Sequence, residues 1–327
     1  MTNRCMGRIV IGVTAIFWLG CSGSDMSTGD IASGTGGASA LSSMSCSGKA
    51  GAKRGQSMEI IDVNGTQRTF VYYAPMNLDP NKAVPFVIVP HGFTMTGLSM
   101  QQITGYNDIA DREGFVVAYP DGEGISPTTG GLTPPWNVGT GVCGAGAAVS
   151  ATGDDQGFVD AMIEWVKADQ CVDESHIFMS GFSMGGYFSN ETGCLNPKIH
   201  GIGPHSGGTH DLSACTNAIM PAMIFHGDAD PLIMYSCGTD ARDKWAEHNG
   251  CMPASMGVDT VQVAMGMCEY NKGCPEGGQV ALCSFSGMGH CWAGGSSSGT
   301  AVGATFGCPG YELASELGWA FFKEYAW

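Results

Sequence analysis

Gly181-Phe182-Ser183-Met184-Gly185 is the stretch that decides the fold, because it follows an apolar run over residues 176–180 and precedes a helix-like segment over residues 184–192. A serine on such a turn between a strand and a helix is held in a strained backbone conformation, with its hydroxyl exposed at the edge of the sheet. Glycines on either side of the serine allow the strand and the helix to pack closely. The pattern predicts that Ser183 is a nucleophile and that the Met184 amide, at a helix N-terminus, points toward an oxyanion.

An aspartate-bearing loop and a histidine-bearing loop come later in the chain, each at the end of a strand-like run. His226-Gly227-Asp228-Ala229-Asp230 follows the first run, and Gly287-Met288-Gly289-His290 follows the second. Serine is a poor nucleophile at neutral pH and needs a base, for which histidine is best suited because its pKa lies near neutrality. A carboxylate then holds the imidazole in one tautomer. The order Ser, Asp, His is that of the α/β-hydrolases, so we expect His290 to be the base.

Two carboxylates compete for the role of the acid. Asp230 lies further along its loop, where its side chain can turn back toward His290, whereas Asp228 more naturally caps the turn. We therefore predict Asp230 as the acid. Among the other histidines, we expect His226 to cap its strand through a hydrogen bond and His205 to have a structural role.

Strand-like and helix-like segments alternate from residue 58 onward. Asn64-Gly65 is a hairpin signal between two alternating segments. Strand-like runs cover residues 59–63, 67–73, 85–90, 115–119, 199–204 and 222–226. Helical spacing covers residues 107–113, 155–169 and the C-terminal segment, where one face carries Leu313, Leu317, Ala320 and Phe321. The alternation predicts an α/β fold with a mostly parallel central sheet and helices on both faces.

Two glycine-containing segments between these runs have features of an active-site border. His91-Gly92 makes a turn after an early central strand, so we expect the Phe93 amide to be the second donor to the oxyanion. Residues 122–153 form a loop of a length that is usually functional, and this loop contains Trp136. Trp136 and Trp292 are candidates for the walls of a substrate cleft, and core packing is an equally open role for both.

The N-terminal segment has the features of an export signal. Arg4 and Arg8 precede an apolar run over residues 9–19, which is followed by Gly20-Cys21,. We expect a signal segment over residues 1–21 with lipidation at Cys21, a flexible Gly/Ser-rich tether over residues 22–57 and a catalytic domain over residues 58–327. An ordinary cleaved signal peptide is the alternative, because Trp18 stands where lipoprotein signals usually have Leu.

Charge and cysteine content narrow the classes of function. The formal net charge is −16 and only 13% of the residues are charged. Such a composition argues against nucleic-acid binding, which needs a basic surface to neutralise phosphates. Of the 14 cysteines, Cys5 and Cys21 lie in the signal segment, and the even number that is left favours disulfides in an exported chain,. We expect Cys251, Cys268, Cys274 and Cys283 to pair among themselves. No Cys-x-x-Cys pair occurs, and we expect no metal site,.

Six segments carry a resemblance, in chain order from about residue 58 to the C-terminus: Val89-Pro90-His91-Gly92, Pro135-Trp136-Asn137-Val138-Gly139, Asp154-Asp155-Gln156-Gly157-Phe158, Gly181-Phe182-Ser183-Met184-Gly185-Gly186, His226-Gly227-Asp228-Ala229-Asp230 and Gly287-Met288-Gly289-His290-Cys291-Trp292. Together they resemble the exported feruloyl esterase and polyhydroxybutyrate depolymerase family, which is carbohydrate esterase family one in the broad sense. The resemblance implies an α/β-hydrolase fold with Ser183 as nucleophile, Asp230 as acid and His290 as base.

The chain departs from that family's pattern at two positions. Met184 stands where many members have Asn, which leaves the oxyanion amide intact. Cys291 stands where Thr is common and resembles half of the tannase-type arrangement, in which cysteines flank both the serine and the histidine. Phe182 precedes the serine in this chain, so that bridge cannot form.

The expected function is hydrolysis of carboxylic esters, including polymeric ones, through an acyl-enzyme, by a monomer and without a cofactor. Feruloyl-type esters of plant polysaccharide are the expected substrate, and polyhydroxybutyrate is the alternative, because both suit an open cleft with aromatic walls. A non-catalytic binding protein on the same fold is the alternative from another class. Such a protein usually lacks a member of the triad, and none is lost here.

Overall fold

The computed structural model describes residues 46, 49, 52–123, 135–139, 142–144, 151, 153–297, 300–301 and 304–326. The chain divides into two units, Met1–Ser42 and Ser43–Trp327, and every described residue belongs to the second. The predicted signal segment, Cys21 and the predicted tether up to residue 45 lie outside the described residues. Cys46 is bonded to Cys171 and the first strand begins at Gly55, so the folded part includes residues that the sequence assigns to the tether.

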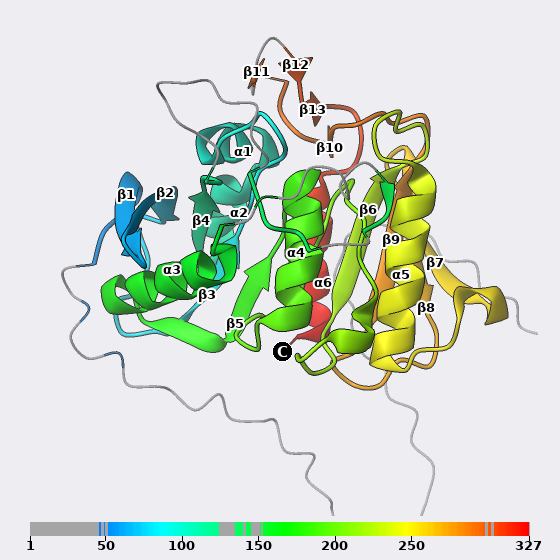
Figure 1. Cartoon of the computed structure of the whole chain (residues 1–327), viewed down its shortest axis with the longest axis horizontal. Helices are drawn as coiled ribbons and strands as arrows, with labels where there is room; N and C mark the ends of the chain where they lie inside the picture. Colours follow the sequence, from blue (N-terminus) through cyan, green and yellow to red (C-terminus); the bar gives the residue numbers. More distant parts are fainter. Residues whose placement is uncertain are drawn as a thin grey trace, which may run out of the picture. The chain divides into compact units, whose positions relative to one another are not determined.

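The central sheet has two halves, with strand orders β1-β2-β4-β3-β5 and β6-β9-β8-β7 (Figure 1). The strands are β1 (Gly55–Val63), β2 (Thr66–Ala74), β3 (Val84–Ile88), β4 (Val116–Pro120), β5 (Val172–Met179), β6 (Ala222–Gly227), β7 (Val258–Val263), β8 (Gly266–Asn271) and β9 (Val280–Phe285). Ile202 bridges β5 to β6 in parallel on both sides, and His205 makes a second pair of bridges further along. The segment predicted as a strand over residues 199–204 therefore joins the halves through isolated bridges only.

Parallel pairing is confined to the centre of the sheet. The pairs β3–β4, β3–β5 and β6–β9 are parallel, as their apolar sequences predict,. The outer strands are antiparallel to their inner neighbours. The predicted hairpin turn between β1 and β2 is confirmed, with positive φ at Asn64 (53°) and Gly65 (86°),. The parallel centre brings the carboxyl ends of β3, β5, β6 and β9 to one edge, where the loops that carry the candidate residues begin.

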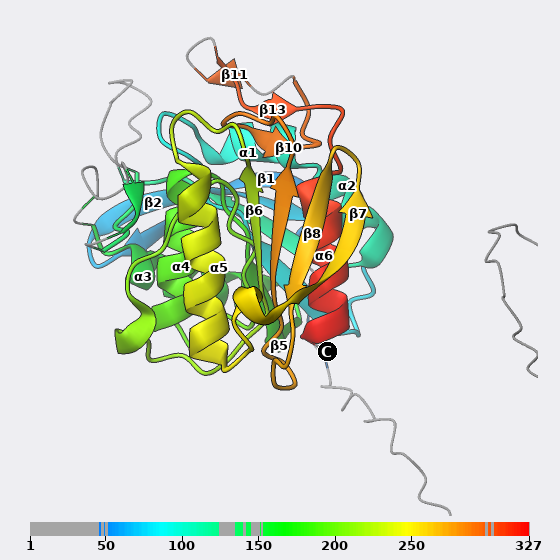
Figure 2. The ribbon, with the colours of Figure 1, turned by 90° about the vertical axis from the view of Figure 1, so that its right-hand side faces the viewer.

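Helices cover both faces of the sheet, as predicted (Figure 2). Their bounds are α1 (Gly97–Thr104), α2 (Tyr106–Glu113), α3 (Asp155–Asp169), α4 (Met184–Leu195), α5 (Tyr235–Asn249) and α6 (Ala314–Tyr325). One core contains Phe158, Phe188 and Trp245 from α3, α4 and α5, and the other contains Ile103, Ile109 and Phe322 from α1, α2 and α6. Within the part of the chain that the structure describes, no helix has the length and apolarity needed to cross a membrane.

Short elements complete the described part. They are the 3₁₀ turns η2 (Leu212–Ala214) and η3 (Ala254–Met256) and the two-residue strands β10 (Trp292–Ala293), β11 (Thr300–Ala301), β12 (Ala304–Thr305) and β13 (Gly307–Cys308). Strand β10 begins two residues after His290 and pairs in parallel with β13. The backbone beyond this histidine is therefore held by a ladder of its own.

Disulfides join the cysteines outside the predicted signal segment. The bonds are Cys46–Cys171, Cys143–Cys237, Cys194–Cys215, Cys251–Cys274, Cys268–Cys283 and Cys291–Cys308. The predicted pairing among the four cysteines around β8 and β9 is confirmed. This density of disulfides is typical of proteins that fold in an oxidising compartment.

A buried ion pair ties β2, α3 and the segment around Trp136 together. Arg68 of β2 lies 2.7 Å from a carboxylate oxygen of Asp155 at the start of α3, and both side chains are buried. The Asn137 amide donates to the other oxygen of Asp155 (2.6 Å). Because breaking a buried pair leaves an uncompensated charge, this contact holds the described part of the long loop close to the sheet.

Candidate active site

Ser183 lies on a tight turn between β5 and α4. Its φ of 55° and ψ of −116° place it in a region that residues with a side chain rarely adopt,. Neighbouring backbone holds it there: its amide donates to the His205 carbonyl (2.8 Å), and its carbonyl accepts from the Tyr187 amide (3.0 Å). Strain of this kind persists only where surrounding contacts over-determine it, which is common at catalytic nucleophiles.

The glycines around Ser183 are required by close backbone approach. A Cβ at Gly181 would collide with the carbonyl of Gly185, and a Cβ at Gly185 would collide with the carbonyl of Pro90. At Gly92, a Cβ would lie 3.1 Å from the Cβ of Ser183, closer than side chains normally approach. The turn after β3 and the turn after β5 therefore pack directly against each other, as the pentapeptide predicts.

Ser183, His290 and Asp230 form a continuous hydrogen-bonded chain. The Ser183 Oγ lies 2.9 Å from His290 Nε2, and His290 Nδ1 lies 2.7 Å from Asp230 Oδ2. Burial favours the neutral form of Asp230, but the hydrogen bond and charge of His290, with the amides of Ile233 and Leu232, outweigh it and lower the pKa of this carboxyl. An ionised carboxylate only accepts, so Nδ1 carries the proton and Nε2 is free to accept one from Ser183.

The two competing carboxylates of the loop have different partners. Asp228 Oδ1 accepts a hydrogen bond from the Gly287 amide (2.7 Å), so Asp228 holds the turn that precedes His290. Asp230 Oδ1 accepts from the Leu232 and Ile233 amides, at 2.9 Å each, while Oδ2 faces His290. The structure thus brings Asp230, and not Asp228, to the histidine.

The amides predicted to bind an oxyanion lie on the turns that meet at Ser183. Met184 is the first residue of α4, where an amide has no partner within its own helix,. Among the described residues, neither the Phe93 amide nor the Met184 amide donates to a backbone carbonyl across a turn or loop. Both amides therefore remain candidates for the oxyanion role.

Neutral His91 fixes the turn that carries Phe93. Its Nε2 accepts from the Gly122 amide (3.0 Å), so Nδ1 carries the proton and donates to the Gly92 carbonyl (2.7 Å),. Complete burial lowers the pKa of His91 to about 4, which keeps the ring neutral near pH 7. This histidine joins the loops that follow β3 and β4.

Both tryptophans predicted as cleft walls are core residues. Trp136 is fully buried, stacks on Phe188 with ring centroids 4.8 Å apart, and donates its Nε1–H to the His91 carbonyl (2.8 Å). Trp292 is fully buried and stacks on His205 at 4.9 Å. A side chain without exposed surface cannot contact a substrate, so the prediction of substrate-binding roles for Trp136 and Trp292 is wrong. Burying these large rings stabilises the loops beneath the site instead.

Two supports of His290 were not predicted from the sequence. Cys291, the next residue, is bonded to Cys308 and so ties the histidine loop to β13. The ring of Phe182 packs against the His290 ring, with centroids 4.9 Å apart. Adjacency in sequence is the only signal for either contact, because neither disulfide connectivity nor ring packing follows from spacing.

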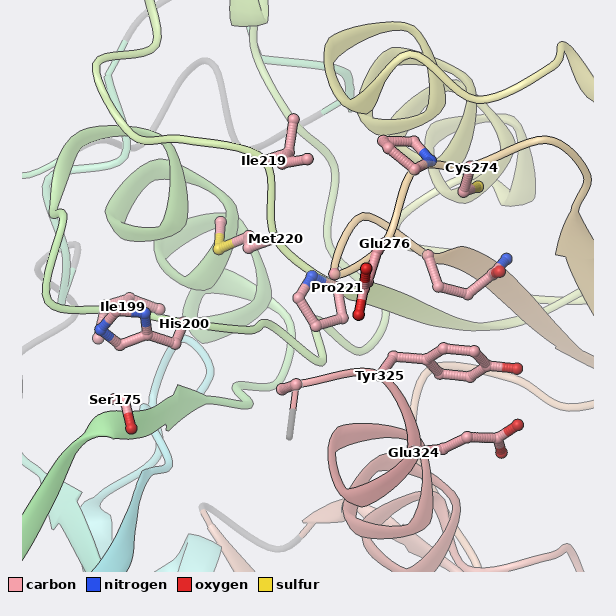
Figure 3. Close-up of a pocket in the computed structure, with 14 residues that line it drawn as sticks. Ser175, Ile199, His200, Ile219, Met220, Pro221, Cys274, Glu276, Glu324 and Tyr325 are labelled. Atoms are coloured by element: carbon pink, nitrogen blue, oxygen red, sulfur yellow. The ribbon is translucent and has the colours of Figure 1, made fainter. Parts of the chain in front are cut away.

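A cavity of about 570 Å³ lies at the opposite edge of the sheet (Figure 3). Its lining includes Ser175 near the start of β5, Pro221 before β6 and Gln279 before β9, with Tyr325 from the end of α6. These positions precede or begin the parallel strands, whereas Ser183, Asp230 and His290 follow them. The cavity is therefore separate from the triad.

A family model described as Esterase PHB depolymerase matches residues 69–262, more than half of the chain. The chain belongs to this family. It is therefore a carboxylic ester hydrolase. The matched range contains Ser183 and Asp230 and ends before His290, which the fold brings to them.

Individual relatives agree with this membership. A probable feruloyl esterase C of Aspergillus terreus is 27% identical over 264 residues, which cover 80% of this chain and 85% of that protein. Feruloyl esterase D of Neurospora crassa is 28% identical over 246 residues, covering 74% and 80%. Among solved structures, an acetyl xylan esterase from Aspergillus awamori matches with a TM-score of 0.55 at 17% identity, covering 72% of this chain and 94% of that one. The last likeness shows the α/β-hydrolase fold.

Proposed function

We propose that the chain is an exported serine esterase with Ser183, His290 and Asp230 as its catalytic triad. The observation that carries the proposal is the unbroken hydrogen-bonded chain from Ser183 Oγ through His290 to Asp230. Its intactness favours an enzyme over a non-catalytic binding protein on the same fold.

The geometry supports a two-step hydrolysis through an acyl-enzyme. Ser183 Oγ attacks the ester carbonyl while His290 Nε2 accepts its proton, and Asp230 stabilises the imidazolium that forms. The Phe93 and Met184 amides stabilise the oxyanion. His290 then protonates the leaving alcohol, and it activates the water that releases the acid and regenerates Ser183.

Feruloyl-type esters of plant polysaccharide are the proposed substrate, because the relatives from Aspergillus terreus and Neurospora crassa are named as feruloyl esterases. Polyhydroxybutyrate is the second candidate, and two observations favour it. The family description names a PHB depolymerase. Leu232 and Met234, on the loop that follows Asp230, are 62% and 60% exposed and offer apolar surface of the kind that a polyester would contact,.

A panel of esters decides between these substrates. We expect kcat/KM for methyl ferulate to exceed that for methyl acetate, which has the same leaving group, by about tenfold or more, which corresponds to ~1.4 kcal/mol of extra transition-state binding. Clearing of a polyhydroxybutyrate suspension, with no hydrolysis of methyl ferulate, would instead support the depolymerase. Failure to hydrolyse any ester in the panel would reject the esterase proposal, with the Ser183→Ala variant as the background control.

Export to an oxidising compartment is part of the proposal and is supported by the disulfides of the folded domain,. Attachment to a membrane through a lipid on Cys21 is a more specific part of this proposal, and it rests on the N-terminal sequence alone. If Cys21 is lipidated, the mature wild-type protein partitions into detergent, because each buried CH₂ of an acyl chain contributes ~0.8 kcal/mol. Cys21→Ser is then released in soluble form or keeps its signal segment uncleaved. A freely soluble wild-type protein whose first residue is not Cys21 would reject attachment.

A further inference from the structure

The acid of the proposed triad depends on a short turn for its orientation. Asp230 Oδ1 accepts the amides of Leu232 and Ile233, which leaves Oδ2 directed at His290. Both oxygens belong to one rigid carboxylate. If the turn moves these two amides away from Oδ1, the carboxylate rotates and Oδ2 no longer points at His290. Whatever fixes Ile233 fixes the acid.

His226 makes the contact that fixes this turn. It lies in β6, is completely buried, and its Nε2 is 2.9 Å from the Ile233 carbonyl oxygen. A carbonyl only accepts, so Nε2 carries the proton and donates. The same nitrogen lies 3.7 Å from Asp230 Oδ2, the oxygen that faces His290, so the ring lies close to the acid as well as to the turn.

The opposite edge of the His226 ring is closed. Nδ1 has no hydrogen-bond partner in the part of the chain that the structure describes, and a Cβ at Gly238 of α5 would lie 2.7 Å from it. Burial lowers the pKa of His226. A second proton would place a buried N–H against Gly238 with no acceptor. The ring is therefore held neutral in one tautomer, the one that donates to Ile233.

Other titratable groups surround this ring from each neighbouring element. Burial and the charge of His290 lower the pKa of His226, whereas the hydrogen bond to the Ile233 carbonyl and the charge of Asp230 raise it. Tyr235, at the start of α5, packs edge-on at 6.0 Å between ring centroids. The burial of the ring, together with His290, outweighs the carbonyl and the carboxylate, which agrees with a neutral ring.

We propose that His226 is a positioning residue for ester hydrolysis, because its Nε2–H bond to the Ile233 carbonyl holds the turn that aims Asp230 at His290. The inference rests on the proposed triad and extends the strand-capping role expected from the sequence. Without the donor, the buried Ile233 carbonyl loses its partner, so the turn rearranges toward water,. Displacing a catalytic group by about 1 Å costs on the order of 10²-fold in rate.

The test uses the full-length protein and p-nitrophenyl acetate. His226→Phe keeps the ring but removes the donor, and we expect kcat to fall by about 10–100-fold while KM changes by less than about threefold. His226→Gln supplies an amide N–H that can reach the Ile233 carbonyl, and we expect it to stay within about fivefold of wild type.

A double-mutant cycle separates positioning from general destabilisation. If His226 acts through Asp230, His226→Phe lowers the kcat of Asp230→Asn by no more than about threefold, since the acid has already lost its function. The same loss in both backgrounds, or wild-type kcat in His226→Phe, would overturn the inference. Wild-type kcat in Asp230→Asn itself would instead show that the proposed triad is wrong.

Gly238→Ala provides a second route if His226→Phe does not fold. Alanine favours the helix more than glycine, but its Cβ displaces the His226 ring,. We expect a lower kcat with unchanged far-ultraviolet circular dichroism. Two results would contradict the proposal. The first is full activity in a folded Gly238→Ala protein whose crystal structure shows that the His226–Ile233 contact has shifted. The second is an equal loss of kcat from Gly238→Ala in the wild-type and Asp230→Asn backgrounds.

Discussion

Ser183→Ala is expected to lower kcat for p-nitrophenyl acetate by a factor on the order of 10⁶ while leaving the fold intact. The hydroxyl is the only nucleophilic atom of the residue, and the 2.9 Å contact with His290 Nε2 is lost with it. Water held by the same histidine cannot replace a serine that the turn between β5 and α4 has pre-positioned. The measurement is steady-state kinetics of both proteins under one set of conditions.

Ser189→Ala is the matched control for this variant. Ser189 lies in the same helix, α4, is fully buried, and donates its hydroxyl to the Gly185 carbonyl (2.8 Å). This hydrogen bond does not involve His290, so we expect its loss to change kcat by less than about threefold and to lower stability by ~1 kcal/mol,. Ser183→Ala activity above about a hundredth of wild type would reject Ser183 as nucleophile.

Asp230→Asn is expected to lower kcat by about 10⁴-fold, because an amide cannot hold the His290 tautomer that accepts the serine proton. Asn at this position presents either an N–H to His290 Nδ1, which reverses the tautomer, or a neutral oxygen, which no longer stabilises the imidazolium. The measurement is kcat at the pH optimum, with circular dichroism to confirm folding.

Asp228→Asn tests the same loop with the same chemical change. Its oxygen still accepts from the Gly287 amide, so the turn before His290 keeps its hydrogen bond and we expect a loss of less than about tenfold,. The comparison of the two losses of kcat shows which carboxylate is the acid. A larger loss for Asp228→Asn than for Asp230→Asn would show that the acid is wrongly assigned.

Much of the fold and of the candidate site follows from local sequence patterns. Apolar runs predicted β3 and β4, and the glycines around Ser183 predicted a turn whose backbone leaves no room for a Cβ. Chain order and a place after a strand-like run selected His290 from eight histidines, and position along the loop selected Asp230 over Asp228. These signals are strong because they arise from backbone geometry, which every member of such a fold must satisfy.

Other features depend on tertiary contacts that spacing does not reveal. On α6 the predicted face is partly wrong: Ala320 is exposed and Leu317 half-buried, whereas Ala314, Gly318 and Phe322 are buried. The buried side combines these small residues with Trp319 and Phe321, so it is rotated relative to the predicted face. Gly201, Gly203 and Pro204 reduce the segment before His205 to isolated bridges, because glycine and proline both weaken strand pairing,.

The burial of Trp136 and Trp292 was equally hidden from the sequence. Both tryptophans lie in glycine-rich surroundings that resemble the border of a cleft, yet each fills a space beneath a loop. The partners that decide this, Phe188 and His205, belong to segments distant in the chain. Sequence alone gives the chemistry of a side chain but not which neighbour covers it.

Covalent labelling of the intact enzyme tests the central claim most directly. Phenylmethylsulfonyl fluoride reacts with an activated serine hydroxyl, which attacks sulfur and displaces fluoride, and peptide mass spectrometry then locates the adduct. The account predicts one sulfonyl group per molecule, on the peptide that contains Ser183, and loss of activity in proportion to labelling. It predicts no adduct in Ser183→Ala and slower labelling in His290→Ala than in the wild type. Stoichiometric labelling of another residue together with loss of activity, or an enzyme fully labelled at Ser183 that still hydrolyses esters, would contradict it.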